Sequence, residues 1–242
     1  MAVNLELIDA ASVLIVRDNE QTGAFEVLMV RRHPDIDFAG GAYVFPGGKV
    51  DVADIELSEP VPSFPIGYSE LTHTAYREVL EESGVLIGRG ENISFYRNAL
   101  IKEEISFTEF MIKASVTFNV DDLVPFARWI TPKTYTKRFD TRFYLARAPK
   151  DQYAIPDGHE VIESTWVEPI DFINKNIDKM MFPTLMNLKL LAEATNVEEA
   201  IKYARTRKTI IIEPKIKNGI RIIDPAAGYG EVNQEKIHQG FK

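Results

Sequence analysis

The sequence predicts an α/β fold, because strand-like and helix-like segments alternate along its 242 residues without an internal repeat. Segments rich in β-branched and aromatic residues indicate strands, and apolar residues at three- and four-residue spacing indicate helices. The most distinctive feature is a glycine turn that is followed, further along the chain, by a helix rich in glutamate. We therefore expect a sheet with helices packed against it and a site where the turn meets that helix.

Six segments predict strands because β-branched and aromatic residues are frequent in them. They are residues 11–17, 25–32, 42–45, 127–131, 139–146 and 161–167. Gln21-Thr22-Gly23 separates the first two segments, which predicts a hairpin. The third segment leads into the turn Pro46-Gly47-Gly48, and the fourth ends at a proline, which cannot donate a hydrogen bond to a neighbouring strand.

The principal helix is expected to follow Ser69 and to run to Ser83. Ser69 predicts an N-cap, and Gly84 ends the helix because glycine readily adopts the left-handed conformation needed just past a C-terminus. Three prolines between residues 55 and 68 predict a loop before it. Further helices are expected over residues 105–116, where a strand is the weaker alternative, and over 183–194 and 197–205.

The chain after residue 207 predicts a separate extension. Asn218-Gly219 is a strong hairpin turn signal, and it lies between the strand-like residues 209–213 and 220–223. The tail beyond this hairpin is expected to be weakly ordered unless it docks on the rest of the protein. We therefore divide the chain into a domain over residues 1–207 and a hairpin and tail over residues 208–242.

Composition and charge are those of an ordinary globular protein, with 45% hydrophobic and 26% charged residues. No apolar run approaches the ~20 residues of a membrane span, and no basic stretch followed by an apolar one predicts a secretory signal. The net charge of −8 argues against nucleic acid or an anionic membrane as partner. The sequence has no cysteine, which excludes disulfides and thiolate chemistry. We expect a cytoplasmic protein.

Three glutamates on the principal helix predict a site for a divalent cation. Glu78, Glu81 and Glu82 fall within one arc of about 100° on a helix. Like charges at this spacing repel by a few tenths of a kcal/mol per pair, so a cation should offset them. Because hard divalent cations take oxygen ligands, an ion such as Mg²⁺ is expected there.

The glycine turn and the glutamate helix together resemble the signature of the Nudix hydrolases, G-x5-E-x7-R-E-U-x-E-E-x-G-U, where U is a bulky apolar residue. Gly48 matches the first glycine, and residues 77–85 match the whole second half. The sequence departs from the signature in two ways. Asp54 stands at the first acidic position, and twenty-two residues instead of seven separate it from Arg77, so the motif is split by an insertion at about 55–68.

The resemblance implies an α/β/α sandwich with a mixed sheet and hydrolysis of the pyrophosphate bond in a nucleoside diphosphate linked to another moiety. It implies that Glu78 and Glu82 are the principal ligands of Mg²⁺ or Mn²⁺, with Glu81 contributing, and that Glu78 and Glu81 take part in catalysis. Arg77 would orient the glutamates. Structural roles in the motif fall to Gly47, Gly48, Asp54 and Gly84.

Four residues outside the motif are further candidates. Glu160 stands in a loop before a late strand, where many family members carry an acidic residue, and it is expected to act as a base or a metal ligand. Arg31 and Arg32 follow a strand and could bind phosphate or the nucleotide, although a solvated strand end is an equal alternative. Arg142 stands two residues after Asp140, and its alternatives are a salt bridge within the sheet and a substrate phosphate.

The insertion in the motif and two downstream segments together resemble one branch of the family, which includes mammalian peroxisomal and mitochondrial coenzyme A diphosphatases. The two segments are Trp129-Ile130-Thr131-Pro132 and the strand over 138–146. This resemblance implies coenzyme A or acyl-CoA as the substrate. ADP-ribose, NADH or another dinucleotide remains an alternative, as does a module that senses a nucleotide without cleaving it. Family habit also implies a homodimer.

Overall fold

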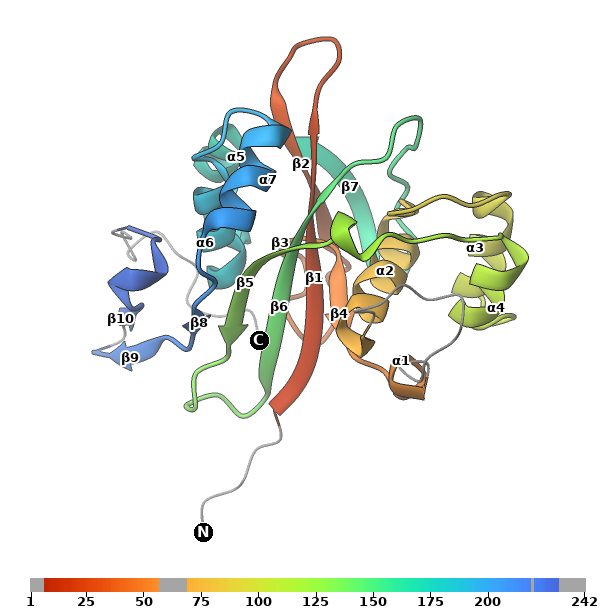
Figure 1. Cartoon of the computed structure of the whole chain (residues 1–242). Coiled ribbons are helices and arrows are strands. Elements are labelled where there is room, and N and C mark those ends of the chain that lie inside the picture. The colour runs from red at the N-terminus through yellow and green to blue at the C-terminus, as the bar shows by residue number, and fades with distance from the viewer. Residues whose placement is uncertain (1–6, 57–68, 219, 231–242) are drawn as a thin grey trace.

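A mixed sheet forms the centre of the fold in the computed structural model, which describes residues 7–56, 69–218 and 220–230 (Figure 1). Its strands run in the order β3-β2-β1-β6-β5-β8, while β4 pairs with β1 and β7 pairs with β2. The strands are β1 (Leu7–Asp18), β2 (Phe25–Arg32), β3 (Tyr43–Val44), β4 (Gly47–Lys49), β5 (Val124–Ile130), β6 (Arg138–Arg147), β7 (Val161–Val167) and β8 (Ile211–Ile212). The central pair β1–β6 is parallel and the pairs β1–β2 and β5–β6 are antiparallel, which confirms the mixed sheet.

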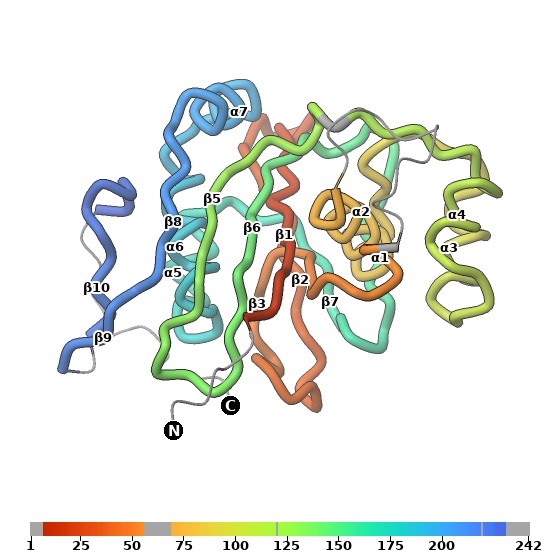
Figure 2. Tube along the Cα trace, turned by 60° about the horizontal axis from the view of Figure 1, so that its bottom comes forward, coloured from red at the N-terminus to blue at the C-terminus, as the bar shows by residue number. Residues whose placement is uncertain are grey.

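Helices cover both faces of this sheet, as Figures 1 and 2 show. The α-helices are α1 (Val52–Glu56), α2 (Glu70–Ser83), α3 (Ile93–Ile101), α4 (Phe107–Lys113), α5 (Pro169–Asn176), α6 (Phe182–Leu191) and α7 (Val197–Thr206). Short 3₁₀ turns span Val120–Asp122, Ile177–Lys179 and Pro225–Ala227. The helices α2–α4 pack on one face and α5–α7 on the other, so the expected α/β/α sandwich is confirmed.

Strand β1 explains why two cores form. Its side chains alternate between the faces of the sheet. Leu14 and Val16 join the core under α5–α7, and Val13 and Ile15 join the core under α2–α4. All four are fully buried, as expected for a central strand covered on both sides.

Helix α2 forms where the sequence predicted it. The Ser69 side chain accepts from the backbone N–H of Thr72, whose side chain in turn accepts from the Ser69 N–H, so the two residues form a capping box. Gly84 takes the left-handed conformation at φ +72° and ends the helix. The helix buries Ala75, Val79 and other apolar side chains against the sheet, which leaves its acidic side chains at the edge of the sheet.

Several elements were not predicted. Helices α1, α3 and α5 lie in segments for which the sequence predicted no helix. The glycine turn itself became strand β4, which pairs antiparallel with β1 through Ala11 and Gly48. Glycine permits this approach, because a Cβ at Gly47 would lie 2.5 Å from the Cα of Ser12. Most of the loop expected over 55–68 lies outside the described residues.

The hairpin after residue 207 differs from the expectation. Its second strand, β10 (Ile220–Ile222), lies within the expected residues 220–223, but its first strand is β9 (Lys215–Lys217) instead of residues 209–213. Ile211–Ile212 instead pairs in parallel with β5 as β8. Pro214 separates the two pairings, because it has no N–H to donate to a ladder.

The segment that follows the hairpin docks on the sandwich. Tyr229 is buried, and its hydroxyl donates to Asn187 Oδ1 at 2.7 Å, which also accepts from the indole N–H of Trp129 at 3.1 Å. Ala227 is buried in the same core. In the described part of the chain, none of the helices combines the length and the apolar character that crossing a membrane requires.

Candidate active site

A cavity of about 1740 Å³ lies at one end of the sheet, beside α2 and β4. Acidic residues of α2, the glycines of β4 and the loop before β7 line one part of it. Aromatic residues of β5 and β6, the start of α6 and the hairpin β9–β10 line another part. Because ligand pockets commonly span about 300–1,000 Å³, this cavity has room for an extended ligand.

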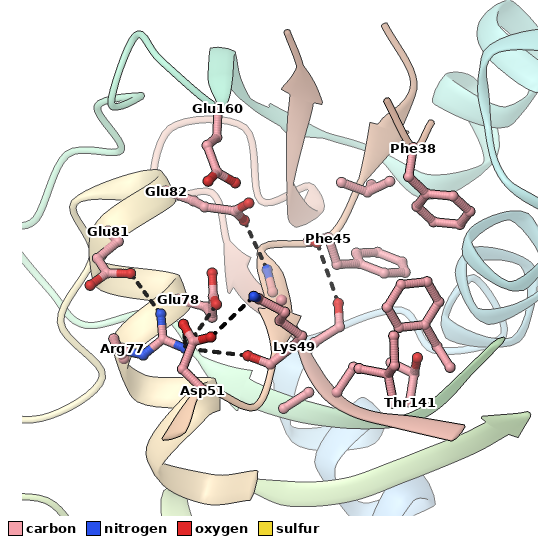
Figure 3. A pocket seen from close by; sticks show the side chains of 18 of the residues that line it. Phe38, Phe45, Lys49, Asp51, Arg77, Glu78, Glu81, Glu82, Thr141 and Glu160 are labelled. Atoms are coloured by element: carbon pink, nitrogen blue, oxygen red, sulfur yellow. Dashed lines mark hydrogen bonds and ion pairs between the residues drawn. The ribbon is translucent and has the colours of Figure 1, made fainter. Parts of the chain in front are cut away.

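Glu82 lines this cavity as a deeply buried acid, with 2% of its surface exposed. Its Oε2 accepts from the backbone N–H of Gly47 at 2.8 Å, which joins α2 to the glycine turn (Figure 3). Its Oε1 is buried and has no hydrogen-bond partner among the described residues. Nη1 of Arg32 lies 4.0 Å from this oxygen. A buried carboxylate oxygen left in this way is costly unless a ligand completes it.

Arg77 gathers the carboxylates around it, as Figure 3 shows for part of the network. It donates from Nε and Nη2 to the two oxygens of Asp54 at 2.9 and 2.8 Å. It also donates from Nη1 to Glu81 at 2.8 Å, and its Nη2 lies 3.0 Å from Glu78. A further bond to the carbonyl of Lys49 at 3.3 Å ties it to the glycine turn. The guanidinium thus sets where the helix carboxylates stand.

Asp54 is fully buried behind this network. Besides the two bonds from Arg77, it accepts from the N–H of Asp51 at 2.9 Å and from the hydroxyl of Thr74 at 2.8 Å. Burial alone would raise the pKa of Asp54, but the hydrogen bonds and charge of Arg77 outweigh it and hold the pKa below the ordinary value. Asp54 therefore links α1 to α2 as an ionised carboxylate.

The glutamates show the opposite tendency. Burial raises the pKa of Glu78 to about 8, with the charges of Glu81 and Glu160 adding to the effect and Arg77 opposing it. Burial, followed by the charge of Glu78, raises the pKa of Glu82 well above its ordinary value. Burial also raises the pKa of Glu81. These carboxylates are crowded and desolvated without enough positive charge to offset them, which a divalent cation would supply.

The carboxylate oxygens of these glutamates do not converge on one point. Across residues 7–56, 69–218 and 220–230, no three His, Cys, Asp or Glu side chains form a ready-made metal cluster. Glu81 is held by Arg77, whereas Glu78 and Glu82 flank the glycine turn and Glu160 points toward Glu82 (Figure 3). The structure therefore brings Glu78, Glu82 and Glu160 to the same part of the cavity.

Gly48 leaves space for one of these carboxylates. A Cβ at this position would lie 2.3 Å from Oε1 of Glu78. We predict that Gly48→Ala displaces the Glu78 carboxylate and lowers kcat/KM about 100-fold, since a misplacement of about 1 Å can cost that much. The midpoint of thermal unfolding should change little, because the side chain that must move is flexible. Steady-state kinetics and thermal unfolding of the variant test this, and wild-type activity would contradict it.

His73 lies behind the network on α2 and was not singled out by the sequence. It is 1% exposed, and its Nε2 lies 3.4 Å from Asp54. Burial lowers the pKa of His73 from 6.5 to about 4, although the charge of Asp54 opposes this and that of Arg77 adds to it. His73 is therefore neutral in the folded protein at pH 7.

This shift predicts a pH dependence of stability. The unfolded chain takes up the proton near pH 6.5 and the folded chain only near pH 4, so His73 stabilises the fold above pH 6.5 and loses this contribution as the pH falls from 6.5 to 4. The loss amounts to roughly 3 kcal/mol. Denaturant unfolding of wild type and His73→Gln between pH 7.5 and 4 tests it. Because other groups also titrate in this range, the result is the difference in the free energy of unfolding between the two proteins. If this difference stayed constant from pH 7.5 to 4, the prediction would be contradicted.

Not every predicted residue reaches the cavity. Arg32 lines it, whereas Arg31 and Arg142 are not among the described residues that line it. Arg31 donates to the carbonyl of Gly41 and lies over the ring of Tyr43. Arg142 pairs with Asp9 at 2.7 Å and Asp140 at 2.9 Å, so the salt-bridge alternative describes its contacts. Both side chains contact neighbouring residues of the fold.

Glu160 does line the cavity, from the loop before β7. Asp157 shapes this loop by accepting from the N–H of Glu160 at 2.7 Å, and the Glu160 carbonyl accepts from the N–H of His33 at 2.8 Å. The backbone is thus held while the side chain is exposed. This leaves the Glu160 carboxylate available to a ligand.

Sequence reasoning also missed Arg97, which anchors α2. Its guanidinium is buried and donates to the carbonyls of Leu80, Glu81 and Ile155, each at 2.8 Å. A cation at the C-terminus of a helix is favourable because the carbonyls there carry partial negative charge. Nothing in the spacing along the chain indicates this contact, because it depends on how α3 packs against α2.

Comparison with known proteins agrees with this geometry. Residues 7–186 match the family model of the NUDIX domain. The chain is 28% identical to the Caenorhabditis elegans protein named "Putative nudix hydrolase 7", over 78% of this chain and 63% of that protein. It is 23% identical to an acyl-coenzyme A diphosphatase of Homo sapiens, over 76% of this chain and 64% of that protein.

A solved NUDIX hydrolase from Alicyclobacillus acidocaldarius is 27% identical and superposes with a TM-score of 0.70, covering 82% of this chain and 97% of that one. The chain spans about 63–64% of the length of the two curated relatives. The family model covers well over half of the chain. The chain therefore belongs to the NUDIX domain family.

Proposed function

We propose that the protein is a metal-dependent hydrolase that cleaves the pyrophosphate bond of a nucleoside diphosphate linked to another moiety. The observation that carries the proposal is the pair Glu78 and Glu82, two buried carboxylates beside the glycine turn, of which Glu82 keeps one oxygen without a hydrogen-bond partner in the described part of the chain. Such a pair has little use in a purely structural helix, because it raises the free energy of the metal-free fold.

The donor set fits a hard divalent cation. It offers the carboxylate oxygens of Glu78, Glu81 and Glu82, whereas the histidine of α2 that lines the cavity, His73, lies 3.4 Å from Asp54. Glu78, Glu81 and Glu82 would hold Mg²⁺ or Mn²⁺. When bound, the ion neutralises phosphate oxygens and lowers the pKa of a bound water.

The protein side chains have distinct parts in the proposed reaction. Arg77 positions Glu81 and Glu78 through bonds of 2.8 and 3.0 Å rather than by contact with substrate. Glu160 is exposed in the same cavity and is proposed to accept a proton from the attacking water. Arg32, 4.0 Å from Glu82, is proposed to contact a phosphate oxygen.

We further propose coenzyme A or an acyl-CoA as the substrate class. The size of the cavity supports an extended substrate, and the name of the human relative supports this class. ADP-ribose and dinucleotides are the competing class, since they carry the same cleavable bond.

The test is turnover of coenzyme A, an acyl-CoA, ADP-ribose and NADH with Mg²⁺ or Mn²⁺. A coupled phosphatase releases the phosphate groups that cleavage exposes, and the released phosphate is measured. We expect cleavage that needs the metal ion, with the highest kcat/KM on a coenzyme A compound. A higher kcat/KM on ADP-ribose or NADH would show that these compounds, and not coenzyme A compounds, are the substrate class. Tight nucleotide binding without cleavage would replace the enzyme by a sensing module.

A further inference from the structure

A row of paired residues crosses the sheet along the cavity and ends at Trp129. Lys49 of β4 pairs with Ala10 of β1. Ala10 pairs with Thr141 of β6, which in turn pairs with Trp129 of β5. Residues paired across a sheet share a face, and all four line the cavity. Because neighbouring strands lie about 4.8 Å apart, Trp129 stands roughly 14 Å from the strand that carries the glycine turn.

The far end of this row is therefore separate from the glutamates that serve the proposed cleavage. Figure 3 shows the same order, with Lys49 between the glutamates of α2 and Thr141. A ligand that binds at the glutamates can reach Trp129 only with a group that extends along the sheet.

The polar atom of Trp129 is used inside the protein. Its indole N–H donates to Oδ1 of Asn187 at 3.1 Å and to the hydroxyl of Tyr229 at 3.3 Å. Neither partner is among the described residues that line the cavity. Since the N–H is the only polar group of a tryptophan side chain, Trp129 offers a ligand only carbon atoms. The ring of Phe182, nearly perpendicular to the indole at a centre distance of 5.9 Å, adds to this apolar surface.

Tyr229 completes the network behind Trp129. Its hydroxyl donates to the same oxygen of Asn187 at 2.7 Å, and its ring centre lies 5.3 Å from that of the indole. Asn187 is fully buried, whereas Trp129 and Tyr229 are 3% and 8% exposed. The indole is thus held by two hydrogen bonds and by contacts with the rings of Tyr229 and Phe182.

Local turn chemistry brings Tyr229 to this place. Asp224 caps the 3₁₀ turn Pro225–Ala227, because its side chain accepts from the N–H of Ala226 at 2.9 Å. Gly228 follows with φ +78°, a left-handed conformation that glycine adopts without strain. The chain reverses there, and the next side chain, Tyr229, enters the core.

We propose that Tyr229 is a positioning residue, which holds Trp129 as a wall for an apolar group of the substrate. The inference rests on the proposed function, because the pyrophosphate would lie at the glutamates and the group linked to it would extend to Trp129. A fatty acyl chain and an adenine ring both present apolar surface that such a wall fits. Residues 224–230 lie beyond the family model, which ends at residue 186, and they thus take part in choosing the substrate.

The first test separates KM from kcat in Tyr229→Phe, with octanoyl-CoA and coenzyme A as substrates. The substitution keeps the ring and removes the hydroxyl. We expect KM to rise about 3- to 10-fold, the range of one hydrogen bond. The kcat should stay within about a factor of two, because Tyr229 does not contact the reacting atoms.

The pattern of this rise identifies the apolar group. A larger rise in KM for octanoyl-CoA than for coenzyme A assigns the group to the acyl chain, and an equal rise assigns it to the adenine ring. An unchanged KM on both substrates, or a fall in kcat alone, overturns the proposal.

Two comparisons show whether Tyr229 acts through Trp129. Tyr203→Phe removes a tyrosine hydroxyl that donates to Glu199 at 2.7 Å away from the cavity, and it should leave KM unchanged. Trp129→Phe removes the indole N–H, so adding Tyr229→Phe to it should raise KM little further. Fully additive effects of the two substitutions would contradict a role of Tyr229 through Trp129.

Fluorescence tests the contact without cleavage. In Trp166→Phe, Trp129 is the one tryptophan left in the sequence, and Trp166 is not among the described residues that line the cavity. Stopped-flow mixing with octanoyl-CoA or ADP-ribose and Mg²⁺ should change the emission of Trp129 as the compound binds. Weaker binding after the addition of Tyr229→Phe supports the positioning role even where neither compound is cleaved. A compound that is cleaved without any change in emission refutes the contact and leaves the proposed function standing.

Discussion

Glu82→Gln is expected to lower kcat by at least about 100-fold, because metal ions contribute several kcal/mol to the transition state and each 1.36 kcal/mol is tenfold in rate. The amide oxygen of glutamine can still accept the bond from Gly47 that Glu82 accepts at 2.8 Å, so the geometry of the turn is kept. What is removed is the negative charge on a buried oxygen without a partner among the described residues. The substitution therefore tests whether activity needs the negative charge of Glu82, while the geometry of the turn is kept.

Thermal unfolding of the same variant gives an independent readout. In EDTA, Glu82→Gln should melt at or above the wild-type temperature, because a desolvated carboxylate with a raised pKa is replaced by a neutral group. Saturating Mn²⁺ should raise the wild-type midpoint, since a ligand bound only to the folded state stabilises it, and should raise that of the variant much less.

Glu70→Gln is the matched control, because Glu70 lies in the first turn of the same helix and does not line the cavity. It should keep both activity and the Mn²⁺ response. If Glu82→Gln retained wild-type turnover and the full Mn²⁺ response, Glu82 would not be a ligand. If it lost activity and also melted much earlier in EDTA, its role would be structural.

Arg77→Met is expected to cost about 3–5 kcal/mol in the free energy of unfolding, the usual cost of removing one partner from a buried ion pair. The substitution would leave Asp54, which is fully buried, without the two bonds that it accepts from the guanidinium. It would also release Glu81 and Glu78, which would then face each other without a cation between them. Denaturant unfolding at pH 7 measures the loss, and kcat should fall with it.

Arg147→Met provides the comparison, because Arg147 pairs with Glu198 on the surface, where both side chains are about half or more exposed. Its cost should stay within about 1 kcal/mol. Adding Asp54→Asn to Arg77→Met should recover part of the lost stability, since the orphaned buried charge disappears. A loss below about 1 kcal/mol for Arg77→Met would show that the network does not support α2.

The local pattern of the sequence was enough to predict helix α2 with its cap at Ser69 and its end at Gly84. Helix capping and helix termination depend on residues that are adjacent in the sequence, so local sequence patterns can predict them. Strand β4 could not be predicted in this way, because a glycine pair alone does not reveal that β1 passes beside it. The same holds for β8, which pairs with β5 across more than eighty intervening residues.

Some features of the candidate site could likewise be predicted from the sequence, and others depend on the fold. The spacing of Glu78, Glu81 and Glu82 indicated a cation site on one face of a helix. It did not indicate that Arg77 would hold Glu81 while Glu82 bonds to Gly47, since these contacts depend on which side of α2 meets the turn. For Arg31 and Arg142 the sequence left two alternatives, and their neighbours in the fold occupy both side chains.

The acidic face of α2 could be predicted from the spacing of residues along one helix, and the short motif around it indicated the family and thereby the sandwich of sheet and helices. Three features became visible in the folded structure: which oxygen of Glu82 lacks a hydrogen-bond partner among the described residues, how His73 is desolvated, and that Arg221 reaches the cavity. The physical reason is that burial and long-range contacts are set by how the two helical layers and the hairpin pack on the sheet, and this packing leaves no local mark in the sequence.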